Sequence, residues 1–341
     1  MPIDVIISPE QVIAQDIYER LSVPGTTFVI PLAEGRAHMI GLICNQNCPV
    51  VSTPLKELEK LFLNLSFKVM GIMRNNKPIF PGPDDQLYVG DEVYLVADTK
   101  HLGRVMAAFG HEEKEARRIV IAGGGSIGFS LAKMLLKQGR GTQIKMIENN
   151  QKRAEYLSEQ LENVVILNGN GLDQDILEEA SIENVETLVA VTNDDESNIL
   201  GSLLAKQAGC ERVITLVNNN SYTPLIGPLG IDAMVSPRAT IVSTIMQHVR
   251  RGRIRGLHNL REGFAEVFEA EVSDTSQLVN MHVADANFPP DVILGAIVRD
   301  KKVIIPDDQQ MIKAEDILIL LASQEQAKTL EKIFSVQVDL F

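Results

Sequence analysis

The most constraining feature of the sequence is residues 118–148, where a strand, a glycine loop, a helix and a second strand follow one another. A β-branched run ends in the spacing Gly-x-Gly-x-x-Gly at Gly123, Gly125 and Gly128. The apolar residues then recur at helical spacing, and a second apolar run ends in Glu148, 20 residues after Gly128. This is the order of elements that a dinucleotide-binding βαβ unit requires.

Each glycine of the loop has a physical role in such a unit. The first permits a tight turn, the second lets the backbone approach a pyrophosphate, and the third lets the helix pack close to the strand. The helix then begins with its free N–H groups and its positive dipole end facing the phosphates. The predicted phosphate-binding residues are Gly123, Gly124, Gly125, Ser126, Ile127 and Gly128.

Glu148 is the predicted ribose ligand, because a carboxylate accepts hydrogen bonds from a ribose diol. This favours NAD(H) over a nucleotide with a 2′-phosphate. ADP and ATP carry the same diol, so Glu148 does not separate them from NAD(H). The alternative is a degenerate lobe in which the glycines form a turn and bind nothing.

Strands and helices alternate after Glu148, which predicts an α/β, Rossmann-like, doubly wound parallel sheet. Predicted strands 164–167 and 185–192 are each followed by small polar residues. Ligands of open α/β sheets bind at this carboxyl edge. Polar residues at these two strand ends therefore belong to the candidate site.

Asn170 and Asp173 are candidates for the adenosine half of the ligand, and Thr192 and Asn193 for the region near the pyrophosphate. For Asp173, and for Asp195, the alternative is an N-cap of the helix that follows.

Composition excludes several classes of protein. The formal charge of −13 argues against general nucleic-acid binding. No run approaches 18 apolar residues, and the start has no secretory signal, so a cytoplasmic protein is expected. Cys44, Cys48 and Cys210 are expected to be free thiols, because no further Cys or His pair completes a zinc set. No metal site is predicted.

The chain contains a two-fold internal repeat. Residues 3–9 and the following helix match residues 231–237 and the helix after them, at an offset of 228. Residues 71–81 and 90–97 likewise resemble 295–306 and 314–322. Such a repeat of a domain-sized unit differs from the short periods of a solenoid.

The repeat predicts the domain organisation. Residues 1–25 are expected to be the last strand and helix of a first Rossmann-like lobe, with an independent strand–helix cap as the alternative. Residues 26–110 form a small α+β domain, 111–117 a charged linker, 118–252 the complete lobe and 253–341 a second small α+β domain. In the first small domain we expect strands at 28–32, 37–43, 69–73, 77–80 and 93–96, with helices at 54–63, after a Thr53 cap, and 100–109.

Several ordered motifs, together with the repeat, resemble the TrkA family. These proteins are the cytoplasmic regulatory subunits of bacterial Trk potassium-uptake systems and are built from tandem RCK/KTN units. The resemblance covers nearly the whole chain. It rests on residues 123–128, 169–171, 191–200 and 231–238.

The resemblance implies a fold, a ligand and partners. The lobe is expected to bind NAD(H), with ATP or ADP at the same site. It would be an RCK N-terminal domain flanked by two RCK C-terminal domains. The lobes are expected to form a homo-oligomeric ring at the inner face of the plasma membrane, where the nucleotide state gates a Trk-type integral membrane potassium pore subunit. The apolar edge that a partial lobe leaves exposed also favours assembly.

Two positions depart from the family pattern. Ser126 stands where the family often has Arg or Asn, so a side-chain charge on the phosphates is absent there. Asn170 follows Gly169 where the family usually has Asp, which weakens the hydrogen-bond acceptor.

The basic stretch 250–261 has two readings, a phosphate or acidic-partner site and a solvated crossover after a helix. The competing functional classes are an NAD-dependent oxidoreductase and a structural nucleotide-binding protein without a gating role. An oxidoreductase needs an acid or base near the nicotinamide. None of the six histidines lies at the strand ends of the lobe, and Tyr222 with Lys206 forms no Tyr-x-x-x-Lys pair. We therefore predict no catalytic residue and no enzyme activity.

Overall fold

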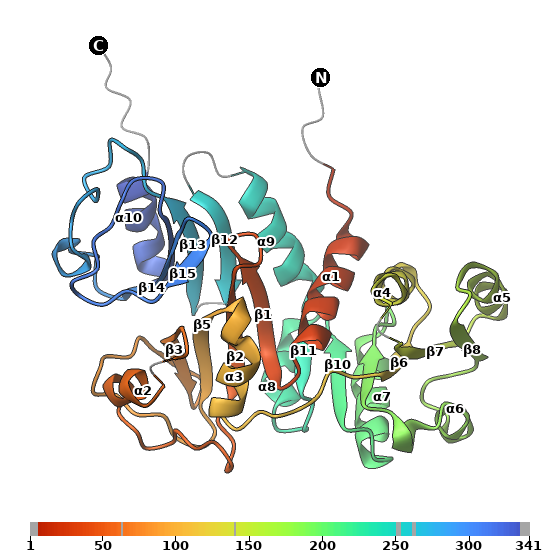
Figure 1. Ribbon diagram of the computed structural model, residues 1–341. Helices are drawn as coiled ribbons and strands as arrows, with labels where there is room; N and C mark the ends of the chain where they lie inside the picture. Colours follow the sequence, from red (N-terminus) through yellow and green to blue (C-terminus); the bar gives the residue numbers. More distant parts are fainter. Residues whose placement is uncertain (1–5, 63, 140, 250–253, 261–263, 335–341) are drawn as a thin grey trace. The chain divides into compact units, whose positions relative to one another are not determined.

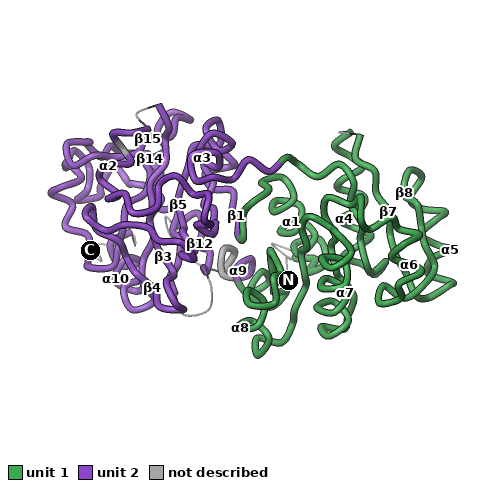
Figure 2. Tube along the Cα trace, turned by 90° about the horizontal axis from the view of Figure 1, so that it is seen from below, with its two compact units in different colours: residues 1–27, 114–242 green, residues 28–113, 243–341 purple. Residues whose placement is uncertain are grey.

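The computed structural model describes residues 6–62, 64–139, 141–249, 254–260 and 264–334. The chain divides into two compact units, each assembled from two separated segments (Figure 2). The first unit comprises Met1–Thr27 and Lys114–Val242, and the second comprises Phe28–Glu113 and Ser243–Phe341.

The first unit contains a parallel sheet of six strands in the order β11-β10-β9-β6-β7-β8 (Figure 1). The order reverses between β6 and β9, which makes this the switch point of a doubly wound sheet. The predicted fold class of the lobe is therefore confirmed. The strands are β6 (Arg118–Ala122), β7 (Gln143–Glu148), β8 (Val164–Asn168), β9 (Thr187–Ala190), β10 (Arg212–Leu216) and β11 (Ala233–Val235).

Helices cover this sheet with their apolar faces. The central strands are buried on both faces, as the β-branched runs require in a parallel sheet. The helices of the lobe are α4 (Ser126–Lys137), α5 (Gln151–Gln160), α6 (Gln174–Glu179), α7 (Asp195–Gln207), α8 (Thr223–Ile226) and α9 (Pro237–Val249). Single 3-10 turns lie at Ile182–Asn184 and Asn220–Tyr222.

Helix α1 (Pro9–Ser22) belongs to the same unit and packs on α4. Its residues Ile13, Ile17 and Leu21 recur every four positions and enter the core that contains Leu131 and Leu135. The expected strand before α1 falls partly outside the described residues, and residues 6–8 are not in a strand.

The second unit contains two antiparallel sheets with one topology. The first has the order β1-β2-β5-β3-β4, and the second has the order β12-β13-β16-β14-β15. Strands β1 (Thr26–Leu32) and β2 (Ala37–Ile43) precede β12 (Ile254–Leu260) and β13 (Ala265–Glu271) by 228 positions. The other strands are β3 (Phe67–Arg74), β4 (Lys77–Ile79), β5 (Glu92–Asp98), β14 (Val292–Arg299), β15 (Lys302–Ile304) and β16 (Ile317–Ser323), and these pairs are offset by 225. The internal repeat is thus a repeat of structure.

The two antiparallel sheets share one apolar core. Tyr94 and Met70 of the first sheet lie in the same cluster as Phe264 and Leu321 of the second. Both β3 and β14 carry a register shift, at Met70 and at Gly295. The Met70 sulfur fills the space beside Gly295, where a Cβ would lie 2.3 Å from it.

Two local expectations were wrong, one about a helix cap and one about the basic stretch. Helix α2 (Leu55–Leu61) has Pro54 as its N-cap and makes no side-chain cap, so Thr53 does not cap it. In the second small domain the corresponding stretch forms a 3-10 turn at Val283–Asp285. Residues 254–260 of the basic stretch form β12 and not a crossover, while 250–253 and 261 lie outside the described residues.

Both small domains end in a helix. The first closes with a 3-10 turn at Thr99–His101 that leads into α3 (Leu102–Ala108). The second closes with α10 (Gln324–Phe334), which buries Ala327, Leu330 and Phe334.

Among the described residues, no helix is both long enough and apolar enough to cross a membrane.

Candidate functional site

The glycine loop lies at the switch point of the parallel sheet. Gly123 follows β6 with a φ of +116°, which L side chains rarely adopt. A Cβ on Gly123 would lie 2.9 Å from the backbone nitrogen of Thr192. The loops after β6 and β9 therefore touch, as a ligand crevice at a switch point requires.

The three glycines of the motif have different neighbours. A Cβ on Gly128 would lie 2.0 Å from the carbonyl oxygen of Gly123, so helix α4 starts against the loop backbone. A Cβ on Gly125 would meet no atom within 4 Å, and Gly125 and Ser126 are exposed. Gly125 is the N-cap of α4 and has no side chain to occupy the first N–H groups of the helix. The start of α4 therefore has no side-chain cap in this structure and presents the positive end of the helix dipole.

Glu148 lies at the end of β7 and closes the glycine loop. Its Oε2 accepts a hydrogen bond from the Gly124 nitrogen at 2.9 Å, and its Oε1 accepts one from the Asn150 nitrogen at 2.8 Å. A carboxylate has about four acceptor directions, so each oxygen retains one for a ribose hydroxyl. Glu148 is half-buried beside the loop, where the sequence predicted it.

Arg153, on α5, also contacts the glycine loop, a contact that was not predicted from the sequence. Its Nε donates to the carbonyl oxygen of Gly124 at 2.8 Å. The guanidinium lies 4.9 Å from the centroid of the Tyr156 ring and 5.6 Å from that of Phe129. Arg153 thus places a cation beside the loop although position 126 carries none. Its position in the first turn of the helix after Glu148 was the available signal.

The loop after β8 holds the two residues assigned to the adenosine half. Asn170 is exposed, and its Oδ1 accepts from the Leu172 nitrogen at 3.0 Å. Asp173 accepts from the Asp175 nitrogen as the N-cap of α6, so the capping alternative describes its contact in this structure. Gly169 is hydrogen-bonded through its nitrogen to the carbonyl oxygen of Glu148, which brings this loop beside the ribose candidate.

The loop after β9 is held by Asn198, a buried residue of α7 that is 1% exposed. Its Oδ1 accepts from the nitrogen and hydroxyl of Thr192, at 2.9 and 2.7 Å. Its Nδ2 donates to the carbonyl oxygens of Thr192 and Leu216, at 3.1 and 3.0 Å. Thr192 is therefore fixed at the switch point, and Asn193 next to it is exposed.

The neighbouring acids have structural roles. Asp194, and not Asp195, is the N-cap of α7. Asp195 is buried and accepts from the backbone nitrogens of Asn218 and Asn219 and from the Asn218 side chain. It ties the loops after β9 and β10 together.

Replacing Asn198 with leucine is expected to lower the free energy of unfolding by about 2 kcal/mol, because buried backbone groups of Thr192 and Leu216 would lose their partners. Urea denaturation followed by circular dichroism measures the change. The matched control is Asn184→Leu at an exposed position, with an expected change below about 0.5 kcal/mol. Equal stability of the two variants would contradict the assigned role.

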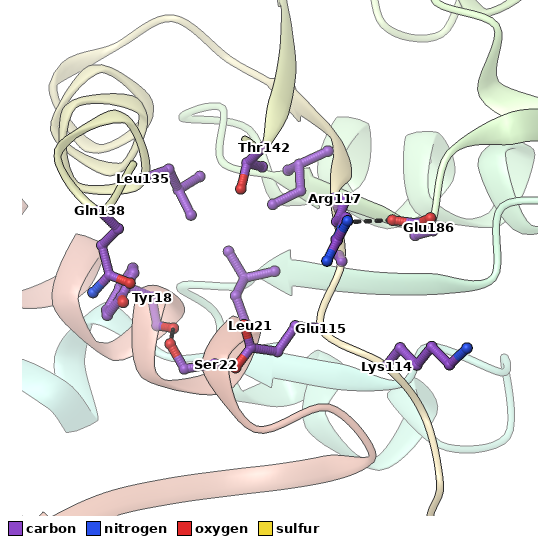
Figure 3. A pocket seen from close by; sticks show the side chains of 12 residues that line it. Tyr18, Leu21, Ser22, Lys114, Glu115, Arg117, Leu135, Gln138, Thr142 and Glu186 are labelled. Atoms are coloured by element: carbon purple, nitrogen blue, oxygen red, sulfur yellow. Dashed lines mark hydrogen bonds between the residues drawn. The ribbon is translucent and has the colours of Figure 1, made fainter. Parts of the chain in front are cut away.

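A cavity of about 800 Å³ in this unit is lined by residues of α1, the end of α4 and the segment before β6 (Figure 3). It is lined by Ile119 at the start of β6, whereas the loop follows the end of that strand. Tyr18 and Leu21 of α1 form another wall. Glu186, which also lines it, already accepts from the backbone nitrogens of Arg117 and Arg118. The cavity is at the amino edge of the sheet and is not part of the predicted nucleotide site.

Family models identify the class of protein that this fold and loop define. The TrkA-N domain model matches residues 119–237, and the TrkA-C domain model matches residues 43–110 and 267–335. One parallel lobe of the first kind is thus combined with two antiparallel domains of the second kind. The fold predicted from the sequence is confirmed.

Curated relatives give the family. The chain is 41% identical over 341 residues to the Trk system potassium uptake protein TrkA of Azorhizobium caulinodans, covering 100% of this chain and 74% of that protein. It is 34% identical over 345 residues to the TrkA protein of Halomonas elongata, covering 100% of this chain and 75% of that protein. The chain belongs to the TrkA family of Trk system potassium uptake proteins, as its motifs predicted.

Solved structures agree in fold. The GsuK RCK domain matches with a TM-score of 0.52 and 18% identity, covering 97% of this chain and 70% of that chain. The GsuK channel bound to NAD matches with a TM-score of 0.50 and 18% identity, covering 96% of this chain and 58% of that chain. At this identity the similarity establishes a common fold.

Proposed function

We propose that the chain is a nucleotide-binding regulatory subunit of a Trk-type potassium uptake system. One observation carries the proposal: the open start of α4 and the carboxylate of Glu148 lie on either side of Gly124 at the switch point of the sheet. An anionic pyrophosphate and a ribose diol match these two groups. Membership of the TrkA family supplies the physiological setting.

NAD(H) is the proposed ligand, with ADP or ATP as competitors for the same site. The residues that would hold it are Gly123, Gly124, Gly125, Ser126, Ile127, Gly128, Glu148, Asn170, Asp173, Thr192 and Asn193. Arg153 would add a positive charge beside the phosphates. A 2′-phosphate would be brought close to the Glu148 carboxylate, so NADP(H) should bind more weakly.

Regulation would follow from differential binding. A ligand shifts a conformational equilibrium only as far as its affinity differs between the two states. The loops after β6, β8 and β9 all meet the proposed ligand, and α4 starts within the first of them. Nucleotide binding would therefore favour one arrangement of the lobe. A ring of lobes would carry this change to a potassium pore subunit in the membrane, with this chain bound at its cytoplasmic face.

A regulatory role is favoured over catalysis. The Tyr222 hydroxyl donates to Glu196, and this hydrogen bond raises the pKa of Tyr222, which makes the phenol a poorer acid. Lys206 pairs with Asp232 at 3.1 Å and also donates to the Glu211 carbonyl oxygen. Neither group is arranged as an acid or base for hydride transfer.

The test is isothermal titration of the purified chain with NADH, NAD, NADP and ATP. We expect diol-bearing nucleotides to bind more tightly than NADP. Glu148→Ala should weaken binding at least about tenfold, because charged hydrogen bonds to the diol are lost. Gly125→Asp should abolish binding, since it places a carboxylate where the phosphates approach.

The matched control is Glu155→Ala. Glu155 is an exposed acid on α5, and this variant should bind nucleotides like the original chain. Equal binding by all three variants would place the ligand elsewhere. No binding by the unaltered chain, or turnover of NADH with carbonyl substrates, would overturn the proposal.

A further inference from the structure

Two of the three cysteines lie in one turn of the second unit. Cys44 directly follows β2 and is fixed by two backbone hydrogen bonds, from its nitrogen to the Asp91 carbonyl oxygen and from the Gly90 nitrogen to its own carbonyl oxygen, both at 2.8 Å. A third, from the Cys48 nitrogen to the Asn45 carbonyl oxygen at 3.1 Å, closes the turn between them. The two cysteines are 0% and 5% exposed.

The side chains of Cys44 and Cys48 affect each other's titration. Interaction with Cys44 lowers the pKa of Cys48 to about 7, with help from the backbone of Val50 and from His111, against the opposing effect of burial. Interaction with Cys48, together with burial, raises the pKa of Cys44. Thiolate is the nucleophilic form of cysteine, so the two thiols are unlike in reactivity.

The segment after α3 holds the turn in place. Gly110 has a φ of +83°, and a Cβ there would lie 2.7 Å from the Asn47 carbonyl oxygen and 3.1 Å from the Cys48 Cα. His111, 8% exposed, lies within 3.0 Å of the Ile43 carbonyl oxygen through Nε2 and of Glu113 through Nδ1. The Nε2 contact holds the segment after α3 against the end of β2.

We propose that Cys44 and Cys48 form a reversible intramolecular disulfide when the protein meets a hydroperoxide. Three observations carry this: the burial of both cysteines at the two ends of one turn, the backbone hydrogen bond that closes this turn, and the packing of Gly110 and His111 against it. A disulfide needs two Cβ atoms about 4 Å apart, and two buried side chains on one closed turn can reach this separation with little movement of the backbone.

The chemistry balances with the peroxide as the oxidant. The Cys48 thiolate attacks the distal oxygen, an S–O bond forms, and the O–O bond breaks with loss of an alkoxide or hydroxide that takes up a proton. Cys44 then attacks the Cys48 sulfur, the S–S bond forms, and the hydroxyl leaves as water with the Cys44 proton. In sum, two thiols and one peroxide give one disulfide, one water and one alcohol or second water.

Cys210 serves as an internal control. It is 3% exposed and donates to the Arg212 carbonyl oxygen at 3.2 Å. Burial raises the pKa of Cys210. It is similarly buried and has no thiol beside it, so it should react slowly and form no intramolecular disulfide.

The experiment exposes the folded chain to hydrogen peroxide, quenches it, blocks free thiols in denaturant and measures tryptic peptides by mass. The peptide of residues 37–56 contains both Cys44 and Cys48, and the peptide of residues 207–212 contains Cys210. We expect the first to become lighter by two hydrogens and to lose both blockable thiols, at least about tenfold faster than Cys210 is consumed. Dithiothreitol should restore both thiols. Oxidation of Met39 adds an oxygen and is distinguished by its mass.

Variants separate the two steps. In Cys44→Ser, Cys48 should accumulate sulfenic acid that a dione reagent traps, and no peptide should lose two hydrogens. Urea denaturation of the same variant verifies that it folds. If Cys44 and Cys48 in the unaltered chain stay blockable as long as Cys210, or if Cys48 gains oxygen while Cys44 remains free, the proposal is wrong.

Discussion

Replacing Gly128 with alanine is expected to destabilise the parallel-sheet lobe by about 4 kcal/mol or more, among the larger effects of a single substitution. The added Cβ would lie 2.0 Å from the Gly123 carbonyl oxygen and 3.2 Å from the side chain of Ile121. The Gly123 carbonyl oxygen cannot move aside, because the Gly123 nitrogen donates a hydrogen bond to the Ile147 carbonyl oxygen and fixes this residue beside β7. Loss of hydrogen-exchange protection in β6 and in α4 from Phe129 onward measures the effect.

Gly125→Ala is the matched control for this experiment. A Cβ there meets nothing within 4 Å, so the variant should fold with the stability of the original chain. It should nevertheless weaken nucleotide binding, because the methyl group lies where the pyrophosphate would approach. If Gly128→Ala kept full protection, or if Gly125→Ala unfolded the lobe, the steric roles assigned to the two glycines would be wrong.

Replacing Asp316 with asparagine is expected to lower the free energy of unfolding of the second unit by about 3 kcal/mol or more. Asp316 is 0% exposed and pairs with Arg299 through two hydrogen bonds of 2.7 Å. It also accepts from the Lys313 nitrogen at 2.8 Å. An amide cannot satisfy these donors on both sides, and Arg299 would lose the buried carboxylate with which it pairs.

The repeat supplies a test of this assignment within the same molecule. Asp91 is held in the same way, by Arg74 at 2.8 and 2.7 Å and by the Tyr88 nitrogen at 2.8 Å. Asp91→Asn should therefore cost about as much as Asp316→Asn. The control is Glu34→Gln, which removes an exposed pair with Arg36 and should change stability by less than about 0.5 kcal/mol. Guanidinium denaturation of the three variants gives the comparison, and an Asp316→Asn variant as stable as the control would refute the assignment.

The sequence predicted the parts of the fold that depend on local pattern. Strands β6 and β7 lie on either side of α4 as predicted, and β8 lies within one residue of its expected bounds, because short β-branched runs bounded by glycine and asparagine have few other structures. Gly123, Gly128 and Glu148 lie together because spacing along a βαβ unit determines their positions in space. The repeat in sequence likewise predicted the repeat of the small domains.

The sequence did not predict features that depend on contacts between distant segments. Strand β9 ends at Ala190, earlier than expected. The Thr192 hydroxyl donates to the Asn198 side chain, and this contact holds the residues after Ala190 in a loop. Arg153 reaches the loop only through the packing of α5 beside Gly124. The antiparallel sheet of β12 was missed, because its basic residues resemble a solvated segment until Glu271 pairs with Arg255.

The contact between Met70 and Gly295 has a consequence for how the two small sheets recognise each other. The two residues occupy equivalent positions of the repeat, at the register shifts of β3 and β14, and one fills the space that the other leaves. Two copies of the first sheet would bring Met70 against Met70, and two copies of the second would leave a void between glycines. In a symmetric pair of identical domains this position would carry the same residue on both sides, so one side could not fill a space left by the other. Duplication within one chain freed the two halves to diverge, so that each sheet fits the other better than it fits itself.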